Sequence, residues 1–170
     1  ELYVLKLLWL DSNFIETLHE SAFENLTHLH DLSLTDNKLE AIPRGLNSLR
    51  FLKSLDLGKN QIADITADAF KGLEELLGLR LTDNLIANIS RDTFSALPSL
   101  RVLNLASNKI RHIDQSAFIS NPSISGIRLD NNELEDISGV FTSLSTLVWL
   151  NVSGIDFALS LSLIHISEPT

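Results

Sequence analysis

The chain has 170 residues and 44% hydrophobic content, which suits a folded domain with a sizeable core and excludes a disordered tail. Its formal net charge of −9 argues against nucleic acid as the main partner, because phosphate binding requires a basic surface. The chain has no Cys, which excludes disulfides and Cys-ligated zinc, and no apolar run reaches the roughly 20 residues of a membrane-spanning helix.

A repeat of 23 or 24 residues accounts for nearly all of the hydrophobic residues. Its units begin, in chain order, at Leu5, Leu29, Leu52, Leu76, Leu100, Ile124 and Leu147. Each follows the pattern LxxLxLxxNxIxxIxxxxFxxL, which is cleanest in residues 76–99. A unit this short cannot bury its own apolar face, so the pattern predicts stacked coils that share one continuous core.

The first part of each unit predicts a short strand. In the fourth unit Leu79 and Leu81 flank Arg80, so we expect the leucines to point inward and the arginine to point outward. The late aromatic position predicts a wider, convex side. It is filled by Phe23, Leu46, Phe70, Phe94, Phe118 and Phe141.

An asparagine follows each of the first six predicted strands. These residues are Asn13, Asn37, Asn60, Asn84, Asn108 and Asn132. An amide at this point can bond backbone groups that are left unpaired where the chain turns inward. We therefore interpret the six residues as a structural ladder rather than as solvated turn residues.

The seventh unit begins as LVWLNV in residues 147–152, but Ile155 stands at its asparagine position. Asn and Ile codons can differ by one base, so whether Ile155 is genuine stays open. The last ten residues, LSLIHISEPT, resemble a translated sequencing-library adapter. We therefore expect residues 161–170 to be a non-biological tail. We expect residues 1–160 to form a repeat array that is a fragment, open at both ends.

The repeat resembles the leucine-rich repeat, in particular the 24-residue type with a late Phe of Toll-like receptor and chaoptin-type ectodomains. The resemblance covers residues 5 to about 157. It implies an α/β solenoid, curved into a superhelix with short parallel strands on its concave face. Loops and short helical turns would form the convex face. It also implies that partners bind on the concave face.

The outward strand residues differ from coil to coil, so they are free to specify a partner. The candidates for binding on the concave face are Trp9, Asp31, Asp56, Arg80, Asn104, Arg128 and Trp149. Four carboxylates follow the strands and could meet a basic partner or a cation, although they could also bond the local backbone. They are Asp11, Asp36, Asp83 and Asp130.

No motif for catalysis is present: there is no Gly-rich phosphate loop, no HExxH and no GxSxG. The sequence therefore predicts no enzyme, no cofactor and no metal site. Three N-x-S/T sequons, at Asn25, Asn88 and Asn151, are possible N-glycosylation sites. A fourth candidate, at Asn121, is blocked by the proline that follows it.

Three functions stay open at this point. The first is a protein-binding module in the ectodomain of a cell-surface or secreted adhesion or receptor protein. Its partner would be a protein ligand or another cell-surface protein. The second is an intracellular leucine-rich-repeat scaffold or regulator. The third is the repeat region of a receptor enzyme whose catalytic domain lies outside this sequence. A glycan on Asn25 or Asn88 would exclude the second.

Overall fold

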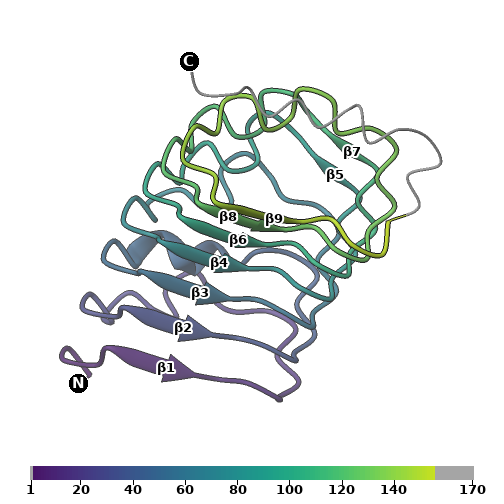
Figure 1. The fold of residues 1–170 in the computed structure, drawn as a ribbon. Helices are drawn as coiled ribbons and strands as arrows, with labels where there is room; N and C mark the ends of the chain where they lie inside the picture. The colour runs from purple at the N-terminus through teal and green to yellow at the C-terminus, as the bar shows by residue number, and fades with distance from the viewer. Residues whose placement is uncertain (1, 156–170) are drawn as a thin grey trace.

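The computed structural model describes residues 2–155, and the predicted tail at 161–170 lies outside them. A seven-stranded parallel sheet runs along one side of the molecule, with one strand from each coil (Figure 1). Its strands, in spatial order, are β1 (Leu7–Trp9), β2 (Asp31–Ser33), β3 (Ser54–Asp56), β4 (Gly78–Arg80), β6 (Val102–Asn104), β8 (Gly126–Arg128) and β9 (Trp149–Asn151).

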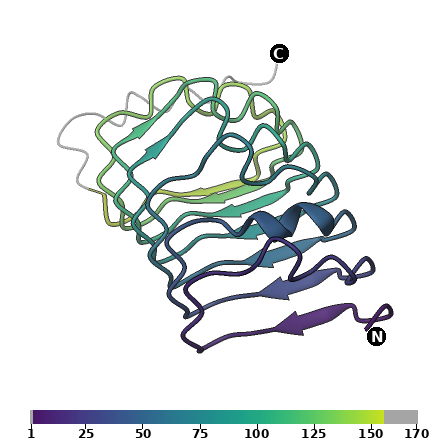
Figure 2. The same ribbon diagram turned by 180° about the vertical axis from the view of Figure 1, so that it is seen from behind.

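The other side of the coils carries little regular structure. A second, two-stranded sheet pairs β5 (Asn88–Ile89) with β7 (His112–Ile113), and η1 (Arg44–Ser48) is a short 3₁₀ helix. Figure 2 shows these elements on the side away from the seven-stranded sheet. No helix within residues 2–155 is long and apolar enough to cross a membrane. The predicted solenoid is confirmed, and the described part of the chain contains almost no helix beyond η1.

The core is a continuous apolar column between the two sides. In the fourth coil Leu79 and Leu81 are buried and Arg80 is exposed, as the alternation predicts. On the convex side the rings of Phe70, Phe94 and Phe118 stack with centroids 6.2 Å apart, and a fourth ring follows at 6.1 Å. The apolar residues of successive coils thus pack on their neighbours, which buries faces that one coil could not cover.

Every coil carries a residue in the left-handed backbone region just before its asparagine position. In the first six coils φ lies between 51° and 57°, and these residues are Ser12, Asp36, Lys59, Asp83, Ser107 and Asn131. Asn and Asp tolerate this conformation better than other non-glycine residues because their short side chains can bond locally. Two of the four predicted carboxylates, Asp36 and Asp83, therefore occupy backbone positions that suit their residue type.

Five of the six asparagines bridge neighbouring coils. Asn84 is buried; its Nδ2 donates to the carbonyl oxygens of Leu57 and Leu81, at 3.0 and 3.1 Å. Its Oδ1 accepts from the amide of Ile62 at 3.0 Å. The same three bonds recur at Asn37, Asn60, Asn108 and Asn132. Asn13 is exposed and, within residues 2–155, bonds only carbonyls of its own coil.

One further buried asparagine, outside the ladder, was not foreseen from the sequence. Asn121 stands where Leu97 stands in the preceding coil, and it is fully buried. Its Nδ2 donates to the carbonyl oxygens of Phe94 and Leu97, at 2.9 and 2.8 Å. This side chain therefore ties the fifth coil to the fourth on the convex side.

We expect Asn84→Leu to lower the free energy of unfolding by about 1–3 kcal/mol, because the buried amide of Ile62 loses the one acceptor that it has within residues 2–155. Chemical denaturation of the purified protein measures this loss. Asn13→Leu is the matched control: Asn13 accepts from no buried amide in the described structure, so its cost should stay below about 1 kcal/mol. Equal costs for the two variants would contradict the structural role of the ladder.

Candidate binding face on the seven-stranded sheet

The outward face of the sheet forms a hollow of about 570 Å³ that is lined by residues from all seven strands. Neighbouring strands pair in one register, so equivalent residues of successive coils stand in columns. The hollow brings together every candidate that the sequence places on this face: Trp9, Asp31, Asp56, Arg80, Asn104, Arg128 and Trp149.

Some of these candidates already bond the backbone of their own coil. Asp56 accepts from the amide of Gly58 at 2.9 Å through Oδ1, and Asn104 accepts from the amide of Ala106 at 3.1 Å. Both bonds tie a strand residue to the turn that follows it, as Asn and Asp commonly do. Asp56 and Asn104 therefore help to shape the strand ends as well as lining the hollow.

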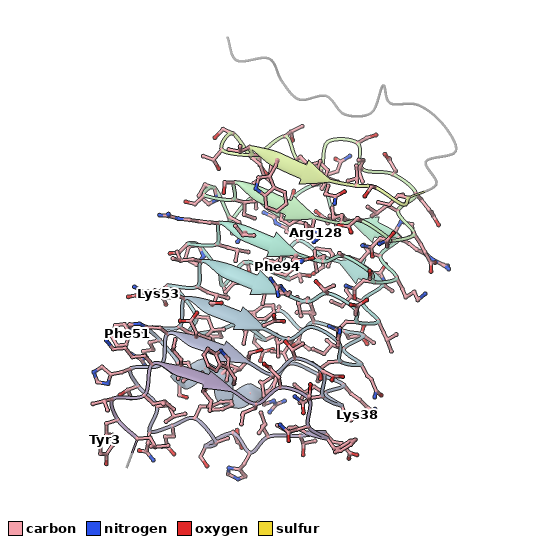
Figure 3. All side chains as sticks on the ribbon, turned by 60° about the horizontal axis from the view of Figure 1, so that its bottom comes forward. Tyr3, Lys38, Phe51, Lys53, Phe94 and Arg128 are labelled. Carbon is pink, nitrogen blue, oxygen red and sulfur yellow. The ribbon has the colours of Figure 1, made fainter. Side chains whose placement is uncertain are left out.

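The two arginines of the hollow are paired with carboxylates of the chain. Arg128 forms a bidentate pair with Asp130, with Nε–Oδ1 and Nη2–Oδ2 distances of 3.0 and 2.8 Å. Hydrogen bonding from Arg128 lowers the pKa of the buried Asp130 carboxyl, and the same bond raises the pKa of Arg128. Arg80 donates to Asp56 at 3.0 Å and stays largely exposed. Figure 3 labels Arg128 on the sheet.

Within residues 2–155, three of the four carboxylates that follow the strands are bonded to other residues of the chain: Asp11, Asp36 and Asp130. Asp11 accepts from the hydroxyl of Ser33 and from the amide of Thr35 in the next coil, and Asp36 accepts from the hydroxyl of Ser12 at 2.9 Å. Among residues 2–155, no three His, Cys, Asp or Glu side chains are placed to hold a metal ion together. Asp11 and Asp36 therefore link the first and second coils through their side chains.

Three candidates form no such bonds within residues 2–155: Trp9 and Trp149 are exposed, and Asp31 is partly exposed. The side chain of Asp31 forms no hydrogen bond or ion pair with any residue in the described range. Trp9 is 67% exposed on β1, and Trp149 is 42% exposed on β9. These residues offer the least compensated charge and the largest aromatic surfaces on the face.

The three sequons differ in their surroundings. Asn25 and Asn88 are exposed and neither lines the hollow. Asn151 is half-buried in β9, and its Oδ1 accepts from both the amide and the hydroxyl of Ser153. Glycans on Asn25 and Asn88 would therefore leave the hollow open.

A parallel-strand solenoid with columns of variable residues on its concave face belongs to the class of solenoid repeat proteins. The family model described as "Leucine rich repeat" matches residues 4–62, 50–110 and 98–156. The chain belongs to the leucine-rich repeat family. This family and fold are typically non-enzymatic protein-interaction modules.

Relatives with similar sequences include a receptor and extracellular proteins. Toll-like receptor 7 of Drosophila melanogaster is 60% identical over 116 residues, which cover 68% of this chain and 8% of that protein. Epiphycan of Mus musculus is 38% identical over 74 residues, which cover 42% of this chain and 22% of the relative. The chain thus matches less than a quarter of the length of either relative.

Solved structures share the fold. Internalin C2 of Listeria monocytogenes superposes with a TM-score of 0.78 at 29% identity, covering 97% of this chain and 68% of that one. The Toll–Spatzle complex of Drosophila contains a chain with a TM-score of 0.69 at 24% identity, covering 91% of this chain and 29% of that one. Both likenesses agree with the solenoid described above.

The pair of Arg128 and Asp130 should make stability depend on pH. Because the folded-state pKa of Asp130 is lowered, its contribution is present above the unfolded-state pKa of about 3.9 and is lost as pH falls through the folded-state value. We expect Asp130→Asn to be less stable than the wild type at pH 7, with a gap that stays constant down to about pH 5 and closes below about pH 4.

Thermal unfolding from pH 2 to pH 8 measures this gap. Asp83→Asn is a suitable control, because Asp83 is exposed and forms no ion pair within residues 2–155. A gap for Asp130→Asn that is independent of pH across the whole range would show that the carboxylate charge does not stabilise the fold.

Proposed function

We propose that this chain is part of the ectodomain of a cell-surface or secreted protein, in which the concave face binds a protein partner. The observation that carries the proposal is the hollow, whose lining changes from coil to coil while the buried residues repeat. A scaffold that needs particular residues inside leaves the outward positions to recognition. Adhesion and receptor signalling would both use such a face.

An extracellular location is supported by the relatives and by the sequons. Epiphycan, vasorin and Toll-like receptor 7 are extracellular or cell-surface proteins. Asn25 and Asn88 are exposed and outside the hollow, where glycans would be compatible with binding. The net charge of −9 favours a protein partner with a basic surface over nucleic acid.

The polar groups of the hollow suit reversible recognition rather than catalysis. Two ion pairs hold the charged groups of the hollow in place on the sheet: Arg80 pairs with Asp56, and Arg128 pairs with Asp130. Such paired charges contribute to specificity and to the rate of association. The proposal therefore assigns the array no catalytic role of its own.

We expect the natural full-length protein to carry N-linked glycans on Asn25 and Asn88, because both are exposed sequons. Enzymatic release of glycans from protein isolated from its source cells, followed by peptide mass spectrometry, should show Asp at both positions. Asn151 is the internal comparison and should stay unmodified, because it is half-buried within strand β9. Bare Asn25 and Asn88 in a protein recovered from the cytosol would contradict the extracellular assignment.

Photo-crosslinking tests the binding face. A benzoylphenylalanine in place of Ser54, which lines the hollow on β3, should form a partner adduct on living cells. The control replaces Asp68, an exposed residue of the same coil that does not line the hollow. We expect the adduct from position 54 to exceed that from position 68 by about tenfold, because contacts on the concave face carry the binding energy. Equal labelling, or labelling from position 68 alone, would contradict the assigned face.

A further inference from the structure

Trp149 occupies the space that a side chain at position 126 would fill. Gly126 on β8 pairs in register with Trp149 on β9, and the indole lies over the glycine. A Cβ atom on residue 126 would clash with Cε2, Cζ2 and Nε1 of the indole. The indole thus packs on the backbone of Gly126, which we call the seat of Trp149. In this position Trp149 lines the hollow and 42% of the residue stays exposed.

An apolar shelf extends from this ring along the same column of the sheet. Val102 on β6 pairs with Gly126 and is 41% exposed, and Gly78 on β4 is next in register. A Cβ atom on Gly78 would meet nothing within 4 Å, so the floor is open at that point. From β4 to β9 this column therefore presents aliphatic and aromatic surface without a charged group.

The uncompensated charge lies at the other end of the hollow. Its lining includes three carboxylates and two guanidinium groups. The Asp56 carboxylate pairs with Arg80, and Asp130 pairs with Arg128, which leaves Asp11 and Asp31 without a cation in the described structure. Both belong to the first two coils, so the hollow is acidic towards β1 and β2 and apolar towards β9.

We propose that the partner docks across the strands with a Lys or Arg side chain at Asp31 and an aliphatic or aromatic side chain against Trp149 and Val102. This inference rests on the proposed concave-face function and adds the chemistry of the partner. Strands β2 and β9 are five sheet positions apart, about 24 Å at roughly 4.8 Å per position. An extended segment of about seven residues spans that length at roughly 3.3 Å per residue.

The seat of Trp149 makes it the better anchor of the two exposed tryptophans. Trp149 is more than half buried against its own chain, so binding costs little further side-chain entropy. The partly exposed Asp31 would act mainly on the rate of association and on its salt dependence. A second copy of this chain is a poor occupant, because a net charge of −9 on each copy would oppose the approach of two acidic surfaces.

Two glycines occupy the same strand position in the fourth and sixth coils, so their alanine variants form a matched pair. Gly126→Ala must displace the indole, whereas Gly78→Ala adds the same methyl group to open space. Trp149→Ala removes the ring without adding a clash, and Asp31→Asn removes the charge at nearly constant shape. Thermal unfolding of each variant separates loss of binding from loss of fold.

The probe is the tightest peptide selected on the intact protein from a random 12-residue display library. We expect it to carry a basic residue and an aromatic or large aliphatic residue about six to eight positions apart. Its affinity should fall about tenfold or more for Trp149→Ala and Gly126→Ala and change less than about twofold for Gly78→Ala. For Asp31→Asn we expect a loss of about threefold or more at low salt that shrinks at high salt.

Two results overturn the inference in different ways. If the selected peptides lose affinity for Ser54→Arg, which blocks the middle of the hollow, but not for the Trp149, Gly126 or Asp31 variants, the partner chemistry is wrong and the binding face stands. If affinity is unchanged by Ser54→Arg as well, the concave-face function is wrong too. A library that yields no binder also overturns the inference, because segments of the required chemistry are present in it.

Discussion

The structure depends on how each coil satisfies the backbone groups that it turns into the core. The carbonyl oxygens of Leu57 and Leu81 each accept from the asparagine of their own coil and from that of the next coil. Shared acceptors of this kind connect the asparagines into one chain of hydrogen bonds, which a water-free interior requires. In the described residues this chain of hydrogen bonds ends at the carbonyl of Leu129. The next asparagine position is occupied by Ile155, which has no side-chain amide to continue it.

This constraint also shapes the proposed binding face. Since the asparagines hold successive coils at one register, the outward strand residues stand in columns, and Trp149 comes to lie beside Gly126. Some residues that could recognise a partner also stabilise the turn of their own coil. Asp56, for example, accepts a hydrogen bond from the Gly58 amide. The docking mode that we propose therefore uses positions where the chain leaves a side chain unbonded, Asp31 and Trp149.

Most of the fold could be predicted from the repeat, because the LxL alternation and the asparagine spacing each follow from burial. The role of Asn121 could not be predicted, because its sequence context shows only a sequon blocked by proline. Nothing there indicates that its side chain reaches back to bond the carbonyls of Phe94 and Leu97 in the preceding coil. The pairing of Arg128 with Asp130 depends on side-chain rotamers, which the pattern does not encode. The seat of Trp149 did have a signal: aligned units place a glycine at its position in the preceding coil.

The phenylalanine stack has a mechanical consequence. Its rings repeat every 6.1–6.2 Å, whereas hydrogen-bonded strands repeat at about 4.8 Å, so each coil is a wedge and the array must arc towards its strands. Tightening the arc would pull the rings apart and open voids, and flattening it would compress them, so both directions cost packing energy. The curvature of the array should therefore resist change in either direction, and a ligand would have to fit the curvature that the free protein already has.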